Sequence, residues 1–235
     1  MGGKVEPTYT LNLQPIDSTD LSEKVYHLLR QKIFDGEFSP GAKLDLSFLE
    51  KALGVSRTPI KNALIRLSEQ GLITIEPRRG TFVTPLTVRE VAECWDVRVA
   101  LEVLAAERGV MQATDGELEQ ARALLGRIVA LRNSVREEYL ERLTLDFQFH
   151  TQLLALARNH RLLDIYEGLH LDVIVARLYY RGGGRDPRRT DEDHQAILEA
   201  YEARDVEAAK RAIIVAAEHG KSLSLRQIEA FGGVI

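Results

Sequence analysis

The segment from Ala52 to Leu72, which reads A-L-G-V-S-R-T-P-I-K-N-A-L-I-R-L-S-E-Q-G-L, carries the strongest structural signal in the chain. It predicts the end of one short helix, a tight turn at residues 54–56 and a second helix that opens at Arg57. Pro59 falls in the first turn of the second helix, where its missing N–H leaves no hydrogen bond unmade. Apolar residues recur along this helix at helical spacing and predict one buried stripe: Ile60, Ala63, Leu64 and Leu67.

The polar side chains of the second helix gather at its exposed N-terminal end. A helix whose rear packs on a small core can place its front in the DNA major groove, where the edges of the bases are read. We therefore expect the chain to bind double-stranded operator DNA through this end of the helix. The candidate contact residues are Ser56, Arg57, Thr58, Lys61 and Asn62.

Two more helices and a hairpin are expected around this stretch. Helix caps at residues 18–20 precede an apolar helical stripe that ends at Gly36, and a short helix is expected over residues 47–53. From Leu72 to Thr84 the apolar residues alternate, which predicts a β-hairpin. Three short helices followed by a hairpin with a basic tip indicate a winged helix-turn-helix. The tip would contact phosphates or the minor groove through Arg78, Arg79 and Gly80.

Composition limits the class of protein. The chain has 235 residues, 45% of them hydrophobic, and a formal net charge of -4, so it does not coat nucleic acid through bulk charge. DNA contact must then come from locally placed basic side chains. A single cysteine, Cys94, excludes an internal disulfide and favours a packed thiol in a reducing compartment. No apolar run suits a membrane span or a secretory signal, so a cytoplasmic protein without membrane contact is expected.

A second domain is expected to begin at Thr87, where T-V-R-E forms a capping box before a long helical pattern. The expected fold class is mainly α, with the winged helix-turn-helix followed by an antiparallel all-helical bundle. The predicted domains are a flexible arm at 1–17, a DNA-binding domain at 18–86 and a helical effector and dimerisation domain at 87–232. About six bundle helices are expected, over residues 88–112, 115–133, 136–157, 161–181, 190–203 and 205–229.

Four polar residues interrupt the apolar stripes of the bundle. Asp146 and His150 lie four apart on one helix, and His194 and His219 share apolar faces on two later helices. Such groups need partners, because burying them unpaired is costly. One carboxylate and three imidazoles that converge inside a bundle would bind a divalent transition metal ion such as zinc or nickel. The alternative is that Asp146 and His150 form an ordinary helix-surface pair.

The N-terminal motifs carry a specific resemblance. The segment Gly36–Leu44, followed by L-G-V-S-R-T-P, G-L-I and R-R-G-T-F-V, resembles the GntR family of bacterial transcriptional regulators. Members of that family use the Arg and Thr of the S-R-T motif on bases and phosphates, which the resemblance assigns to Arg57 and Thr58. Lys61 and Asn62 stand where the family has Arg and Glu, so the resemblance does not transfer an operator sequence.

The helical part resembles the FCD effector domain of the FadR-type branch, and a count of six helices favours its VanR-like group. Metal-binding members use an Asp-x3-His pair, as at Asp146 and His150, and two further histidines. The resemblance assigns His194 to the first of these. The second usually stands at the position of Ala216, one helical turn before His219, and a turn displaces a side chain by about 5 Å.

Two further sets of residues in the helical part are candidates for a functional role. Arg98 and Glu102 share a helix face, and the plain interpretation is an intrahelical ion pair. The resemblance implies instead that Arg98 receives the carboxylate of a small organic-acid effector, with the metal on the opposite side, because relatives carry R-x3-E in this helix. His170 is a reserve candidate for a metal ligand.

Together with these patterns, the resemblance implies a ligand-responsive transcriptional regulator, a repressor that binds a palindromic operator as a homodimer. Two recognition helices in successive major grooves double the specific contacts. The alternative from another class is a metalloenzyme that activates water at the Asp/His site. Because the sequence offers no placed general base and no nucleophile motif, no enzymatic activity is expected. A metal-independent effector sensor is the second alternative.

Overall fold

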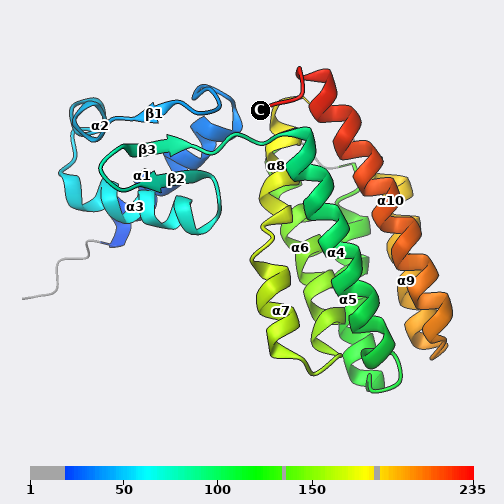
Figure 1. Cartoon of the computed structure of the whole chain (residues 1–235). Coiled ribbons are helices and arrows are strands. Elements are labelled where there is room, and N and C mark those ends of the chain that lie inside the picture. Colours follow the sequence, from blue (N-terminus) through cyan, green and yellow to red (C-terminus); the bar gives the residue numbers. More distant parts are fainter. Residues whose placement is uncertain (1–18, 134–135, 183–185) are drawn as a thin grey trace, which may run out of the picture.

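The computed structural model describes residues 19–133, 136–182 and 186–235, and these form two units that stand side by side (Figure 1). Residues 84–87 run between the two units as an extended connection. The expected arm at residues 1–17 and the cap candidate Ser18 lie outside the described residues. Among the described helices, none combines the length and the apolar character that crossing a bilayer requires.

The N-terminal unit packs three helices against a small antiparallel sheet, which confirms the winged helix-turn-helix. The strands lie in the order β1-β3-β2, and β2 and β3 form the predicted hairpin. The elements of this unit are α1 (Thr19–Phe34), β1 (Lys43–Leu44), α2 (Leu46–Leu53), α3 (Arg57–Glu69), β2 (Ile73–Glu76) and β3 (Gly80–Val83).

Local chemistry sets the turn between α2 and α3. The Asp45 side chain caps α2 by accepting a hydrogen bond from the Phe48 N–H at 2.7 Å. Gly54 ends α2 with a φ of 66°, in the left-handed region that glycine adopts without strain. α3 then begins at Arg57, as predicted, and the predicted apolar stripe is buried: Ile60, Ala63, Leu64 and Leu67.

The sheet contains one strand more than the predicted hairpin. Lys43 pairs with Phe82, and the Gly41 N–H donates to the Val83 carbonyl while the Val83 N–H donates to the Ala42 carbonyl, both at 2.9 Å. The segment before α2 runs through a turn at residues 40–41 and into a short extended piece. That piece becomes an edge strand because the outer side of β3 offers backbone groups for it to pair with.

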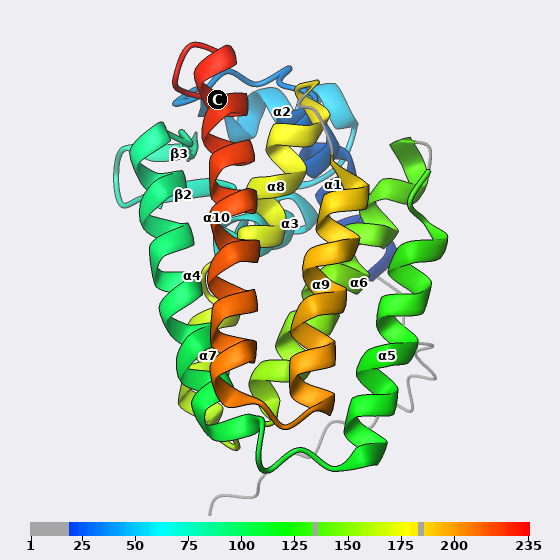
Figure 2. The ribbon, with the colours of Figure 1, turned by 90° about the vertical axis from the view of Figure 1, so that its right-hand side faces the viewer.

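The C-terminal unit is the expected all-helical bundle. The capping box at Thr87 and Glu90 is present, with the Thr87 N–H donating to Glu90 Oε2 at 2.8 Å. In the view turned by 90°, α4, α10, α9 and α5 stand in a row (Figure 2). The described helices are α4 (Val88–Gly109), α5 (Asp115–Ala130), α6 (Arg136–Ala155), α7 (His160–Glu167), α8 (Leu171–Tyr180), α9 (Pro187–Glu202) and α10 (Val206–Ala230).

The prediction of a single helix over residues 161–181 is wrong, because α7 and α8 are separate. His170 has a φ of 49°, a left-handed conformation that cannot continue a right-handed helix. The two halves also bury their apolar residues in different places: Leu162 packs inside the bundle, whereas Val173 packs in the core of the N-terminal unit. The described part of the bundle therefore has seven helices. The count of six, which favoured the VanR-like group, does not hold.

α8 joins the two units (Figure 1). Its Val173 and Ala176 belong to the same buried cluster as apolar residues of α1 and α3. The centroids of the Tyr180 and Phe34 rings are 5.5 Å apart. Arg177 donates to the carbonyls of Thr84 and Ile235 at 3.0 and 2.8 Å, and so ties α8 to the connection between the units. One face of α8 thus belongs to the DNA-binding unit while the helix itself is part of the bundle.

Candidate nucleic-acid interface and metal centre

The polar end of α3 is exposed as the sequence predicted. Arg57, Thr58, Lys61 and Asn62 are all exposed, while the opposite face of the helix is buried. Ser56 occupies the N-cap with an extended backbone, and its side chain makes no capping hydrogen bond. The hydroxyl of Ser56 and the four following polar side chains therefore form one continuous exposed end of the helix.

Arg57 has a partner that the sequence did not indicate. Its Nε donates to Glu50 Oε2 on α2 at 2.8 Å, across the turn that joins the two helices. The contact holds the guanidinium beside the end of α3 and leaves its two terminal amino groups for other acceptors. Only the tight turn at residues 54–56 brings these two positions together, since they are seven apart in the chain.

The wing presents a basic tip. Arg78 has a φ of 66° and Gly80 a φ of 129°, so both lie in the left-handed region that shapes the turn, and Arg78 is exposed. Arg79 forms an ion pair with Glu76 at the end of β2. The side chain of Lys43 crosses Gly80 so closely that a Cβ at Gly80 would lie 2.7 Å from Lys43 Cε. Lys43 therefore adds a third basic side chain to the tip, and only the pairing of β1 with β3 reveals it.

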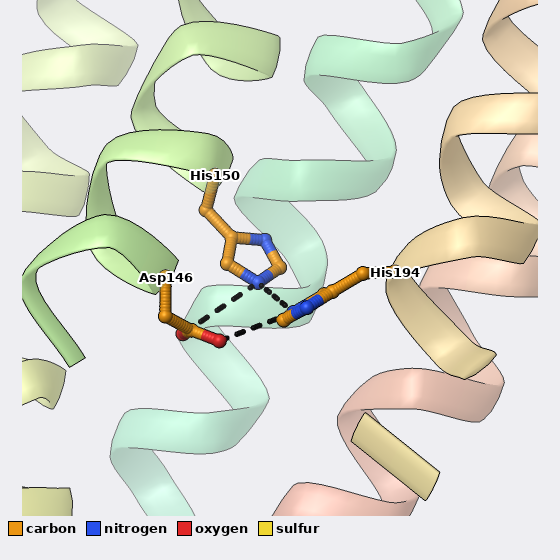
Figure 3. Close-up of side chains that lie close together, drawn as sticks. All are labelled: Asp146, His150 and His194. Carbon is orange, nitrogen blue, oxygen red and sulfur yellow. Dashed lines mark hydrogen bonds and ion pairs between the residues drawn. The ribbon is translucent and has the colours of Figure 1, made fainter. Parts of the chain in front are cut away.

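Inside the bundle, three of the four predicted metal ligands meet (Figure 3). Asp146 and His150 project from α6, and His194 projects from α9 toward them. The Nε2 atoms of the two histidines are 3.0 Å apart, and His194 Nε2 is 3.3 Å from Asp146 Oδ1. The facing ligand atoms of all three lie within 4.8 Å of one another.

The spacing of these atoms suits a bound metal ion. Two nitrogens that each bind zinc at about 2.05 Å lie about 2.9 Å apart at a right angle and about 3.3 Å apart at the tetrahedral angle. The separation of 3.0 Å between the two Nε2 atoms and that of 3.3 Å between His194 Nε2 and Asp146 Oδ1 are close to those values, whereas His150 Nε2 and Asp146 Oδ2 are 4.0 Å apart and would have to approach each other to bind one ion. Imidazole and carboxylate donors suit zinc and nickel, so the donor set fits the group that the sequence suggested.

A second layer of polar groups fixes His150. Its Nδ1 lies 3.1 Å from Glu102 Oε1, and the same oxygen accepts hydrogen bonds from Arg98 Nε at 2.8 Å and from the Tyr166 hydroxyl at 3.0 Å. A carboxylate on the far nitrogen of a histidine is the usual outer partner in metal sites. The sequence paired Arg98 with Glu102 but did not connect either residue to His150.

Burial sets the protonation of the cluster. Removal from water lowers the pKa of His194 to about 4, and the charge of Asp146 only partly offsets this effect. His194 is therefore neutral at neutral pH, which is the form that binds a metal. For Asp146, burial by itself raises the pKa, but interactions of the carboxylate with His194, His150 and Arg98 outweigh it, and the pKa is lowered.

The cluster opens into a cavity of about 380 Å³ between α4, α6, α8, α9 and α10. Arg98, the residue predicted to bind an effector, lies on its wall and is buried. The cavity is aromatic as well as cationic, and residues of α8 form part of its wall. The lining residues of interest are Arg98, Arg142, Arg189, Trp95, Tyr139 and Tyr179.

His219, the fourth predicted ligand, lines the same cavity but stands outside the three-residue cluster. Its Nδ1 lies 2.9 Å from Asp193 Oδ2 and 3.1 Å from Arg189 Nε. Ala216, one turn earlier on α10, also lines the cavity. The reserve candidate His170 lies at the break between α7 and α8 and is not part of the cavity wall.

Comparison with known proteins identifies both units. Residues 21–83 match the model of bacterial regulatory proteins of the gntR family, and residues 93–219 match the FCD domain. The uncharacterized HTH-type transcriptional regulator YdhC of Bacillus subtilis (strain 168) is 29% identical over 195 residues, which are 83% of this chain and 86% of that protein.

Two further comparisons extend over most of the chain. The HTH-type transcriptional repressor RspR of Escherichia coli (strain K12) is 28% identical over 205 residues, 87% of this chain and 89% of that protein. The solved structure of E. coli McbR/YncC has a TM-score of 0.65 at 22% identity and covers 88% of this chain and 98% of that one. At this identity the likeness to the solved structure concerns the fold.

Proposed function

This chain belongs to the gntR family of DNA-binding transcriptional regulators and carries an FCD domain, and from that premise we propose that it is a homodimeric repressor that senses a small organic acid beside a divalent metal ion. It is a regulator and not an enzyme. The metalloenzyme alternative is thereby set aside. The relative RspR is a repressor, which supports the same direction of control here.

The DNA-binding part of the proposal rests on the exposed end of α3 and on the wing. In each protomer, Arg57, Thr58, Lys61 and Asn62 would enter the major groove, with Ser56 beside them. Two protomers would read the two halves of a palindromic operator, because one small module makes few specific contacts. The basic tip at Arg78, Arg79 and Gly80 would contact the backbone next to each half-site.

The sensing part rests on one observation: the cluster of Asp146, His150 and His194 opens into a cavity that has arginines on its wall. These three residues would hold the ion through one carboxylate oxygen and two imidazole Nε2 atoms. A bound metal supplies open positions for the carboxylate of an effector. Arg98 would take a second oxygen of the same carboxylate, since a guanidinium donates two parallel hydrogen bonds.

α8 provides the physical link between sensing and DNA binding. Val175 and Tyr179 line the cavity, whereas Val173 and Ala176 pack in the core of the winged helix-turn-helix. An effector that contacts the cavity side of α8 would bias its position and thereby the placement of the two recognition helices. This is a coupling free energy between two sites, so operator DNA would change effector affinity by the same factor.

Elemental analysis of protein purified after zinc or nickel supplementation tests the metal. We expect about one ion per chain in the natural sequence and a loss of that ion in Asp146→Ala and His194→Ala. Circular dichroism of both variants controls for folding. Protein that is folded, supplemented and still free of metal would support the metal-independent sensor instead. Light scattering on the same samples tests the homodimer by mass.

A further inference from the structure

Arg98 makes a contact that bears directly on metal loading. Its guanidinium is shared between two acceptors: Nε donates to Glu102 Oε1 at 2.8 Å, and Nη2 lies 2.8 Å from His150 Nε2. Arg98, Glu102 and His150 are all buried, at 8%, 3% and 4% exposed. The contact to Nε2 therefore forms at the same nitrogen that faces Asp146 and His194.

The hydrogen bonds around His150 decide what each of its nitrogens does. Nδ1 lies 3.1 Å from a Glu102 carboxylate oxygen, which can only accept, so Nδ1 carries the proton. In the neutral ring Nε2 then has the single lone pair. Arg98 Nη2 can only donate, so that lone pair is the acceptor of the Arg98 hydrogen bond.

One lone pair serves one partner at a time. We infer that Arg98 and a metal ion compete for the Nε2 lone pair of His150, so that metal loading releases the Nη2 end of Arg98 into the cavity. The released N–H groups form an anion subsite next to the ion, which takes a carboxylate. This inference rests on the proposed metal site and adds a binding order. The metal ion binds first, and the Arg98 guanidinium that it frees then binds the effector carboxylate.

The surroundings of Arg98 allow its Nη2 group to leave His150 while its Nε stays bonded to Glu102. Glu102 keeps hold of Nε, and Glu102 is itself held by the Tyr166 hydroxyl at 3.0 Å. On its other side the guanidinium carbon lies 4.7 Å from the centre of the Trp95 ring. Both Arg98 and Trp95 line the cavity. The terminal amino group can thus turn toward the cavity while the charge stays paired with Glu102.

The competition between Arg98 and the metal ion also means that a bound carboxylate would raise the affinity for the metal ion. A cation displaced from His150 and a metal ion beside it repel each other at short range in a buried site. An anion between them offsets that repulsion, so metal and carboxylate each raise the affinity of the other.

Zinc affinity, measured by competition with a chromogenic chelator, tests whether Arg98 competes with the ion for His150 Nε2. Arg98→Lys keeps the positive charge beside Glu102, but the lysine side chain ends one bond short of the Nη2 position, so its ammonium no longer reaches His150 Nε2. We expect Arg98→Lys to bind zinc about tenfold more tightly, because a competing hydrogen bond from a charged donor is removed. Arg132→Lys is the matched control: Arg132 donates to Asp191 at 2.6 Å, away from the cluster, and its substitution should leave zinc affinity unchanged.

Fluorescence gives a second reading of the same event. Trp95 is the single tryptophan of the chain, and the Arg98 guanidinium lies over its ring. Zinc is itself spectroscopically silent, so a change in emission on titration reports movement of Arg98. We expect that change in the natural protein and its loss in Arg98→Lys.

The outcomes separate this inference from the proposed metal site. Zinc bound equally well by the natural protein, Arg98→Lys and Arg132→Lys overturns the competition and leaves the metal site standing. Zinc bound by none of them, or bound equally after Asp146→Ala, removes the metal site itself. Thermal unfolding of each variant, followed by circular dichroism, identifies any variant that fails to fold. If Arg98→Lys fails to fold, the Trp95 titration of the natural protein decides by itself. Unchanged Trp95 emission at full zinc loading then rejects the release of Arg98.

Discussion

The exposed end of α3 and the buried cluster of Asp146, His150 and His194 are built in opposite ways. On α3 the side chains proposed to contact DNA are neighbours in the sequence, exposed to water, and backed by a buried apolar stripe. In the bundle, Asp146, His150 and His194 come from two helices far apart in the chain and are enclosed by other polar groups. The comparison teaches that an exposed reading surface is a local property, whereas a buried site exists only through tertiary packing.

The same contrast sets what a substitution costs. An exposed side chain on α3 can be removed without touching the core, so binding alone should suffer. A buried polar residue of the cluster supports its neighbours, and removing it leaves groups without partners.

Arg57→Ala should reduce operator affinity most. One well-placed arginine is worth about 1–3 kcal/mol per half-site, so a dimer would lose about 2–6 kcal/mol of specific binding. Because Arg57 is exposed and its partner Glu50 lies across the turn on the surface, the melting temperature should stay near that of the natural protein. Fluorescence anisotropy on an operator fragment measures the loss. Unchanged specific affinity would remove this helix end as the reading surface.

His194→Ala and His219→Ala should differ although both residues line one cavity. Loss of His194 removes an atom that lies 3.0 Å from His150 Nε2, and zinc affinity should fall by more than about 100-fold, the upper range for outer partners of a metal. His219 is held by Asp193 and Arg189 outside the cluster, so its loss should change zinc affinity by less than about threefold, well under 1 kcal/mol. Chelator competition measures both, and equal losses would place His219 among the ligands.

Gly220→Ala should destabilise the bundle without affecting the contacts of α3. A Cβ at Gly220 would lie 2.1 Å from Trp95 Cη2, so the indole must shift, at a cost of about 1–3 kcal/mol. Gly126→Ala is the control, because no atom lies within 4 Å of a Cβ there, and alanine should stabilise α5 by about 0.5–1 kcal/mol. Thermal unfolding compares the two. A Gly220→Ala protein as stable as Gly126→Ala would show that Trp95 does not need this space.

Arg78→Ala should have the smallest effect, and it should show mainly in the salt dependence. If Arg78 contacts one phosphate, its loss lowers the slope of log affinity against log salt by about 0.9 per protomer. Specificity should persist, because phosphates carry no sequence information. Arg161→Ala is the control, since Arg161 is exposed on α7 in the other unit. An identical slope for Arg78→Ala and Arg161→Ala would mean that the wing tip does not touch the backbone.

The parts of the fold that were predictable are those set by short-range chemistry. The turn at Gly54, the buried stripe of α3 and the capping box at Thr87 each depend on a few adjacent residues, and each was confirmed. The break at His170 was missed because the apolar spacing continues through it. Only the packing of Leu162 and Val173 into separate cores requires the chain to stop and turn there.

The candidate metal site likewise has residues that could be predicted from the sequence and contacts that could not. The pair of Asp146 and His150 was visible because four residues make one helical turn, and His194 was visible as a histidine in an apolar stripe. The role of Glu102 as the partner of His150, and the attachment of His219 to Asp193, depend on how α4, α6, α9 and α10 lie against each other. Spacing along one helix carries no information about those contacts.

The two architectures, the exposed end of α3 and the residue types available for a metal could be inferred from the amino-acid sequence, because they follow from local period, capping and composition. Three features required the packed structure: three of the four candidate ligands converge, Arg98 contacts His150 Nε2, and α8 belongs to both units. Helix and turn signals act over a few residues, whereas a buried site is made by side chains that only the packed core brings within bonding distance.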